Sequence, residues 1–146
     1  MRPRGCRADA QRDSGSDILV LTGAGDAFSS GGDIRAMRDK IADRTLWNDT
    51  VNEARALFYS IIDLDKPLIA RINGAATGLG ATLAVYADIS IADETAVIGD
   101  PHVKVGLVAG DGGALMWPML IGFQKAKELL MLGDPFDAAK AVGYVG

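Results

Sequence analysis

The feature that most constrains the fold is the run of residues 67–93, in which two apolar segments flank a glycine-rich turn and a helix-like stretch. "PLIARI" (67–72) and "ISIA" (89–92) are expected strands, and their composition is typical of buried strands. A short helix is expected between them, over about residues 79–86. A similar apolar run, "ILVLT" (18–22), occurs earlier in the chain. Strands that alternate with helices in this way predict an α/β fold, with the three runs lying side by side and parallel.

The other expected elements follow from start and stop signals. A helix is expected after Asp33, and a capping-box pattern at Thr50 and Glu53 predicts the start of a second helix. The rest are a strand at 96–99, helices at 112–121 and 124–132 with Gly133 as the C-terminal cap, and a short helix from Asp137 to Gly143. Residues 1–17 are polar and aperiodic, so we expect a loose N-terminal tail followed by one domain over residues 18–146.

Composition narrows the function classes. A net charge of −4 argues against a nucleic-acid partner or an anionic membrane surface. No apolar run reaches the length of a membrane span. Cys6 is the only cysteine, so an internal disulfide is impossible and a reducing, cytoplasmic setting is expected. One histidine and scattered acids lack ligand spacing, so no metal site is expected.

Two glycine-rich turns, each before an expected helix, raise the question of what they bind. "GAGDAF" (23–28) and "GLGATL" (78–83) both lack the third glycine of a dinucleotide fingerprint, and no glycine is followed by the lysine of a P-loop. Two interpretations remain. The N–H groups at the two helix starts, after Gly31-Gly32 and after Gly78, converge on one carbonyl oxygen that becomes negative. Alternatively, the glycines only allow close packing, which the residues alone favour.

A resemblance to a known family changes this balance. "LTGAGDAFSSGGDIRAM" and "KPLIARINGAATGLGATLAVYADISIADETAVIG" resemble the two oxyanion segments of the enoyl-CoA hydratase/isomerase family, or crotonase superfamily. The resemblance implies a crotonase-like β-β-α spiral and an acyl thioester of coenzyme A as substrate, with no other cofactor. It places the two oxyanion-hole N–H groups at Gly32 and Leu79. The substrate-binding residues that it implies are Ser30, Gly31, Asp33, Ile34, Gly78, Gly80 and Thr82.

The chain departs from the family at both catalytic glutamates, which fall at Thr82 and His102. His102 is a candidate acid or base, since histidine titrates near neutral pH; the alternative is that it caps or packs behind Pro101. Asp111 lies one residue from the place of a carboxylate in some isomerases of the family, but an N-cap role is favoured for it. Thr82 is expected to bond back to its own helix.

The family's members are also longer than this chain, so the resemblance implies a shortened member that holds only the core portion of the fold. Association is expected, and we predict a homo-oligomer. Two function classes stay open. One is an enzyme that acts on an acyl-CoA through the oxyanion hole, as a hydratase, isomerase, hydrolase or decarboxylase. The other is a non-catalytic member that binds acyl-CoA or assembles with full-length relatives.

Overall fold

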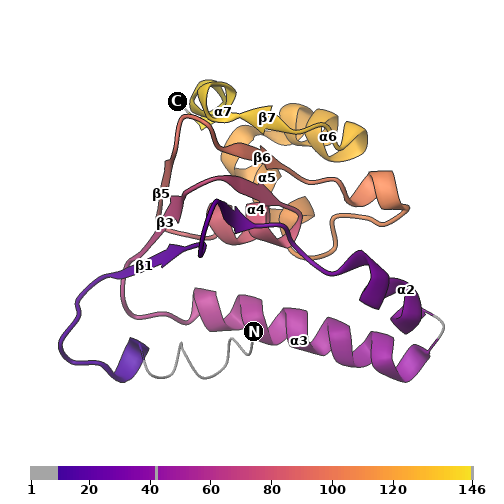
Figure 1. Ribbon diagram of the computed structural model, residues 1–146, viewed down its shortest axis with the longest axis horizontal. Coiled ribbons are helices and arrows are strands. Elements are labelled where there is room, and N and C mark those ends of the chain that lie inside the picture. Colours follow the sequence, from indigo (N-terminus) through magenta and orange to yellow (C-terminus); the bar gives the residue numbers. More distant parts are fainter. Residues whose placement is uncertain (1–9, 42, 146) are drawn as a thin grey trace. The chain divides into compact units, whose positions relative to one another are not determined.

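The computed structural model describes residues 10–41 and 43–145, which belong to two compact units (Figure 1). Unit 1 comprises Met1–Leu19 and Gly32–Pro67, and unit 2 comprises Val20–Gly31 and Leu68–Gly146. Of the expected loose tail, residues 1–9 lie outside the described residues. In the part that is described, Nζ of Lys66 donates hydrogen bonds to the carbonyl oxygens of Ala10 and Asp13, at 2.8 and 2.6 Å. The expected division between tail and domain at residue 18 stays a prediction.

Unit 1 contains two helices, α2 (Ile34–Ile41) and α3 (Arg44–Ile62). The helix expected after Asp33 is confirmed, because Oδ1 of Asp33 accepts from the N–H of Arg35 at 2.9 Å. The expected start of the second helix at Thr50 is wrong. Asp43 caps α3 about two turns earlier. Thr50 lies inside the helix, where its hydroxyl donates to the carbonyl of Leu46 at 2.9 Å.

Unit 2 is built on two sheets, between which the chain alternates. The first has the order β1 (Leu19–Thr22), β3 (Leu68–Ile72), β5 (Ile89–Ala92), and the second has the order β2 (Ala27–Ser29), β4 (Ala75–Thr77), β6 (Val97–Gly99), β7 (Phe136–Asp137). The three apolar runs are therefore neighbours, and β3 pairs with β5 in parallel. The β2–β4 and β4–β6 pairs are also parallel. Each pair of strands adds one strand to each sheet, which gives a β-β-α spiral.

The remaining elements of unit 2 are α4 (Leu79–Val85), the 3₁₀ helix η1 (His102–Val105), α5 (Gly113–Ile121), α6 (Phe123–Leu132) and α7 (Ala138–Val145). Gly133 ends α6 in a left-handed conformation, as expected. Asp137 caps α7 as expected, by accepting from the N–H of Lys140 at 2.8 Å. The expected stop at Gly143 is wrong, because α7 continues to Val145.

The core of unit 2 is made largely of small side chains that let strands and helices approach closely. Its buried members are Phe28, Ala70, Ile72, Ala76, Ala81, Ala84, Ala96, Ile98, Trp117, Ala126 and Leu129. Since α4 carries Ala81 and Ala84 into this core, the first residue of α4 is held at a fixed place on the sheets. No helix among the described residues is long and apolar enough to cross a membrane.

Candidate functional site

The two glycine-rich segments meet in unit 2. Strand β2 leads into Gly31 and pairs with β4, which leads into Gly78 and α4. Gly31 has a φ of +83°, and a Cβ there would lie 2.7 Å from the carbonyl oxygen of Thr77 and 3.3 Å from the amide nitrogen of Leu79. Only glycine suits such a conformation and such an approach. The segments lie side by side because two glycines, Gly31 and Gly80, leave room for backbone.

The N–H of Leu79 is the unpaired donor that this arrangement presents. Gly78 precedes α4 with a φ of +55°, and its own N–H donates to the carbonyl of Gly99 at 2.9 Å. The N–H of Gly31 donates to Oγ of Ser29 at 3.3 Å. Within the part of the chain that the structure describes, no acceptor is bonded to the N–H of Leu79. Gly32 belongs to unit 1, and the expected convergence of its N–H with that of Leu79 stays a prediction.

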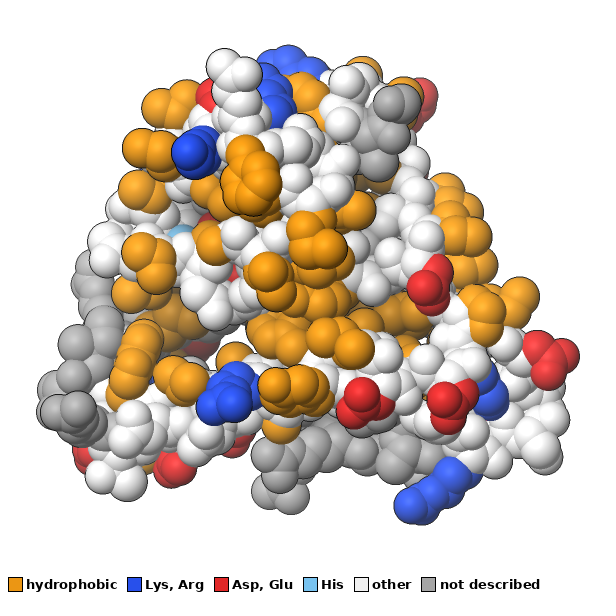
Figure 2. Space-filling view, turned by 180° about the vertical axis from the view of Figure 1, so that it is seen from behind, with side chains coloured by type: hydrophobic (Ala, Val, Ile, Leu, Met, Phe, Trp, Pro, Cys, Tyr) orange, Lys and Arg blue, Asp and Glu red, His pale blue; other side chains and the backbone are white. Residues whose placement is uncertain are grey.

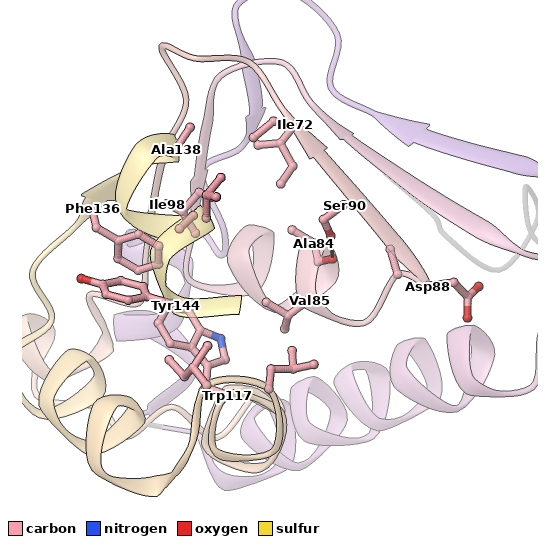
Figure 3. Close-up of a pocket in the computed structure, with 16 residues that line it drawn as sticks. Ile72, Ala84, Val85, Asp88, Ser90, Ile98, Trp117, Phe136, Ala138 and Tyr144 are labelled. Carbon is pink, nitrogen blue, oxygen red and sulfur yellow. Dashed lines mark hydrogen bonds between the residues drawn. The ribbon is translucent and has the colours of Figure 1, made fainter. Parts of the chain in front are cut away.

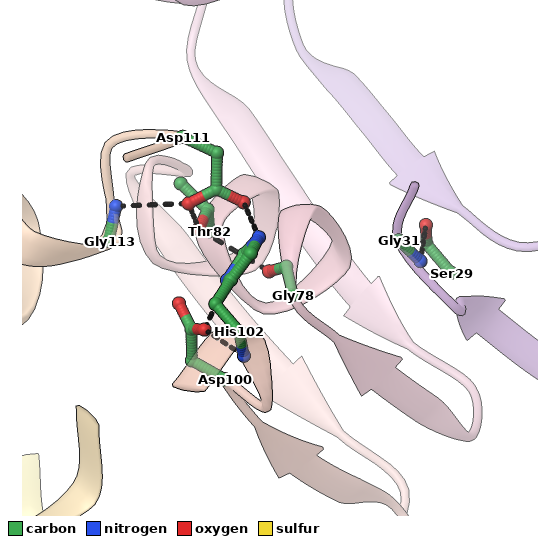
Figure 4. A network of polar contacts seen from close by, with 8 residues as sticks. All are labelled: Ser29, Gly31, Gly78, Thr82, Asp100, His102, Asp111 and Gly113. Atoms are coloured by element: carbon green, nitrogen blue, oxygen red, sulfur yellow. Dashed lines mark hydrogen bonds and ion pairs between the residues drawn. The ribbon is translucent and has the colours of Figure 1, made fainter. Parts of the chain in front are cut away.

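Beside this helix start lies a polar network of four side chains (Figure 4). The imidazole of His102 stands between two carboxylates: its Nδ1–H donates to Oδ1 of Asp100, and its Nε2 lies 3.6 Å from Oδ2 of Asp111. Thr82 donates from its hydroxyl to Oδ1 of Asp111 at 3.1 Å. A Cβ on Gly78 would lie 3.5 Å from Cε1 of His102, so the ring is adjacent to the residue that precedes Leu79.

The network is buried, and burial shapes its electrostatics. The side chain of Asp100 is 1% exposed, while those of His102 and Asp111 are 15% and 13% exposed. The hydrogen bond that His102 donates to Asp100 raises the pKa of His102 above its usual value. Burial opposes this rise, and the charge of Asp111 adds to it. Burial also raises the pKa of Asp111, while His102 opposes that rise. Nε2 of His102 faces Oδ2 of Asp111 across 3.6 Å, so the charge of each group shifts the pKa of the other.

The structure places the residues expected from the family resemblance as follows. Thr82 bonds back to the carbonyl of Gly78 at 3.3 Å, as expected, and also reaches Asp111. The ring of His102 lies between the two carboxylates of Asp100 and Asp111, and its roles as an acid or base or as a cap stay predictions. Asp111 accepts a long hydrogen bond, 3.4 Å, from the N–H of Gly113 at the start of α5. Capping of this helix is therefore a minor part of the contacts of Asp111.

The expected substrate-binding residues fall in both units. Gly31, Gly78, Gly80 and Thr82 are close to the network or to Leu79, as described above. Asp33 caps α2, and Ile34 is the first residue of that helix. Ser30 is exposed. Their contacts with a substrate stay predictions.

Asp100 is the residue that sequence reasoning missed. It follows β6 directly, is 2% exposed, and accepts from both the backbone N–H and the ring of His102. Its second oxygen, Oδ2, has no hydrogen-bond partner among the described residues. The pattern Asp-Pro-His after an apolar strand was the available signal, since an aspartate two residues before a histidine can reach its backbone and ring together.

The acids are not scattered, contrary to the sequence expectation. Asp100, His102 and Asp111 each present one potential ligand atom, and these atoms lie within 4.8 Å of one another. They are the residues that can hold a metal ion in the described part of the chain. His102 already donates to Asp100, and Thr82 already donates to Asp111, which suits a proton-transfer group equally well.

Comparisons with known proteins identify the family of the chain. The family model described as enoyl-CoA hydratase/isomerase matches residues 8–145. The chain is 37% identical over 131 residues to a probable mitochondrial enoyl-CoA hydratase of Dictyostelium discoideum, covering 90% of this chain and 46% of that protein. It is 35% identical over 130 residues to a crotonyl-CoA hydratase of Syntrophomonas wolfei, covering 88% and 49%.

Solved structures show the same fold. The crystal structure of an enoyl-CoA hydratase/isomerase from Mycobacterium paratuberculosis has a TM-score of 0.88 at 38% identity, covering 95% of this chain and 56% of that one. DspI of Pseudomonas aeruginosa has a TM-score of 0.89 at 31% identity, covering 97% and 54%. The chain thus spans about half the length of the relatives that it matches. By its sequence and its crotonase-like spiral alike, the chain belongs to the enoyl-CoA hydratase/isomerase family.

Proposed function

We propose that this protein acts on an acyl-CoA thioester and moves a proton at the carbon next to the thioester carbonyl, with His102 as the base. The observation that carries the proposal is the position of His102, which the buried Asp100 holds by Nδ1 beside Gly78, the residue before the unpaired N–H of Leu79. Family membership supports the substrate class. Because the chain spans about half of its relatives, their named activities are a guide to this proposal and no more.

The oxyanion hole is the first part of the proposed mechanism. The N–H of Leu79 donates to the thioester oxygen, and Gly32, which follows Gly31 in the chain, supplies the second donor on the strength of the family resemblance. Backbone donors at a helix start are fixed in place and carry a partial positive charge. Loss of one such donor in an enzyme typically costs about 2.7–4 kcal/mol of transition-state stabilisation. The hole therefore stabilises an enolate more than the neutral thioester.

The proton step is the second part. With Nδ1–H donated to Asp100, a neutral His102 keeps the lone pair of Nε2 available. The C–H bond at the α carbon breaks, its proton goes to Nε2, and its electron pair moves through the new C–C double bond onto the thioester oxygen. Asp111, 3.6 Å from Nε2, stabilises the resulting imidazolium and is placed to relay the proton back. The His102–Asp111 pair thus takes the role that two glutamates have in the family's hydratases.

Hydrogen exchange tests this step without knowledge of the natural substrate. In deuterium oxide, the protein is expected to exchange the α protons of butyryl-CoA, as followed by NMR or mass spectrometry. His102→Gln should lower the exchange rate by about 10²–10⁴-fold, the usual contribution of a positioned acid–base group. Glu128→Gln, which removes an exposed carboxylate on α6, serves as the control and should leave the rate unchanged. Exchange should also persist in a chelator, since the three side chains act here without a metal.

A second candidate function is acyl-CoA binding without catalysis. The observation in its favour is that Thr82, at the place of one family glutamate, is fully buried and satisfied by Gly78 and Asp111. Calorimetric titration with butyryl-CoA distinguishes the two. Binding without exchange in the wild type supports the binding protein, and the absence of both overturns the proposed function.

A further inference from the structure

We propose that His102 and Asp111 form a binding site for one Zn²⁺ ion, which takes up the lone pair of Nε2 and so blocks the acid–base network. The ion is held by Nε2 of His102 and Oδ2 of Asp111, and water completes its coordination. The binding site stands on observations of its own. Only the loss of activity on zinc binding rests on the proposed function.

The gap between the two ligand atoms has the width that a zinc ion needs. Nε2 of His102 and Oδ2 of Asp111 are 3.6 Å apart, which is too long for a hydrogen bond between them. Oδ2 of Asp111 is buried and has no hydrogen-bond partner among the described residues. Zinc binds imidazole nitrogen and carboxylate oxygen at roughly 2.0–2.2 Å, so at a tetrahedral angle the two atoms stand about 3.3–3.5 Å apart. One ion therefore satisfies both atoms with little movement of either side chain.

Asp100 orients the imidazole in the way that metal-binding histidines require. Such a histidine almost always donates its other ring N–H to a carboxylate or a carbonyl, which fixes the tautomer and aims the free nitrogen at the ion. Nδ1 of His102 makes this contact with Asp100, whose side chain is 1% exposed. Thr82 donates to Oδ1 of Asp111 and leaves Oδ2 free to bind. Figure 4 shows the ring of His102 and the carboxylate of Asp111 pointing toward each other, so both ligands are preorganised.

The charges of the network favour a divalent cation. The carboxylates of Asp100 and Asp111 are buried around one imidazole, and no lysine or arginine among the described residues pairs with either of them. A protonated imidazole supplies one positive charge against two negative ones, whereas Zn²⁺ with a neutral imidazole balances them. Buried charges are stable where they are paired or coordinate a metal. The nitrogen ligand selects zinc, because Mg²⁺ and Ca²⁺ prefer oxygen ligands.

The largest apolar hollow of unit 2 does not compete for the ion. It is a pocket of about 390 Å³, and none of the residues that line it belongs to the network (Figure 3). Its lining includes one carboxylate, Asp88, and no histidine. Asp88 already accepts from the N–H of Leu68 at 2.8 Å. Within the described part of the chain, the potential metal ligands that come together are those of Asp100, His102 and Asp111.

Zinc titration of the protein without a histidine tag tests the site directly. Cys6→Ser serves as the reference protein, because the thiolate of the one cysteine would bind zinc itself. The one histidine of the chain gives a single set of ring proton signals in NMR. Zn²⁺ should shift these signals saturably at one equivalent, and Mg²⁺ should leave them in place. Competition with a chromophoric chelator then measures the affinity for zinc.

Variants of the reference protein separate the ligands from their surroundings. Asp100→Asn should weaken zinc binding by about 10–100-fold, the usual effect of losing a group that orients a ligand. His102→Gln and Asp111→Asn each remove a ligand and should weaken it by more than about 100-fold. Asp134→Asn, the control, alters a carboxylate that is 67% exposed and should leave the affinity unchanged. Should a variant fail to fold, the histidine signals of the reference protein still decide.

The zinc site is overturned if the ring signals of His102 do not move with Zn²⁺, or if Asp111→Asn binds zinc as tightly as Asp134→Asn does. Exchange of the α protons of butyryl-CoA, measured on the same samples, keeps this inference apart from the proposed function. Where exchange occurs, one equivalent of Zn²⁺ should lower its rate to that of His102→Gln, and a chelator should restore it. Exchange that continues with zinc bound would overturn the inhibitory role. Zinc binding with no exchange at any zinc concentration would overturn the proposed function and leave the zinc site in place, and exchange without zinc binding would do the reverse.

Discussion

At the scale of single residues, the decisive arrangement is one imidazole between two buried carboxylates. Asp100 holds the Nδ1 side of His102, so the ring cannot turn without breaking a hydrogen bond in a buried place. This fixes the tautomer and aims Nε2 at Asp111. Two carboxylates so close together also keep a proton on the ring more firmly than water would. The same contacts that orient the base therefore make it a measurable contributor to stability.

The pH dependence of unfolding follows from the sign of that pKa shift. The pKa of His102 is raised, first by its hydrogen bond to Asp100, so the folded chain binds this proton more tightly than the unfolded chain. The resulting stabilisation is fully present below the unfolded value of 6.5 and is lost as pH rises through the folded pKa. Urea unfolding from about pH 6 to pH 9 should show stability falling. His102→Gln should flatten this fall; an equal fall in the variant would contradict the prediction.

At the scale of elements, helix α3 shows which of two candidate side chains, Asp43 or Thr50, caps its N-terminus. Asp43 accepts from the N–H groups of Thr45 and Leu46, at 2.8 and 3.3 Å, and these donors have no other partner at a helix start. Thr50 offers the same kind of oxygen seven residues later but sits where the backbone is already bonded. Position along the helix, and not residue type, decides which side chain stabilises the end.

Substitution of both residues by alanine tests this difference. Asp43→Ala should lower the free energy of unfolding by about 1 kcal/mol, since two N–H groups lose their acceptor. Thr50→Ala should be neutral or slightly stabilising, because alanine is the better helix former inside a helix. Chemical denaturation of the two variants beside the wild type measures both. Equal losses would mean that the helix begins near Thr50 in solution.

The sequence predicts the longer strands, but it predicts the short strands and the candidate site only in part. The four- and five-residue apolar runs of β1, β3 and β5 are recognisable alone, because β-branched side chains favour strands. The expected burial is wrong for β5, which is exposed at every residue, and for β1, which is exposed at every second residue; only β3 has buried positions. Strands β2 and β4 have three residues each and lie inside glycine-rich turns, so only pairing with each other defines them. The role of Asp100 was not predicted for a related reason, because it depends on a fold that buries this residue beside His102.

At the scale of the whole molecule, apolar surface is the outstanding feature. On α5, Leu115 and Met119 are 63% and 72% exposed, and four residues of separation puts them on one face of the helix. Edge strand β5 exposes Ile89 and Ile91 as well. Figure 2 shows many hydrophobic side chains at the surface of one side of the molecule. Large apolar patches usually mark an interaction surface, which supports the expected self-association.

Sedimentation velocity over a range of concentrations tests this expectation. The wild type should sediment faster than a monomer as concentration rises, because burial of α5 removes apolar area from water at about 25 cal/mol per Å². Leu115→Lys with Met119→Lys should shift the chain toward monomer, since lysine is costly to desolvate and the substitutions touch an exposed face. Val108→Lys alters a residue that is 84% exposed in the loop between η1 and α5, and it should leave the association unchanged. A wild type that stays monomeric throughout would show that this apolar surface does not drive contact between copies of the chain.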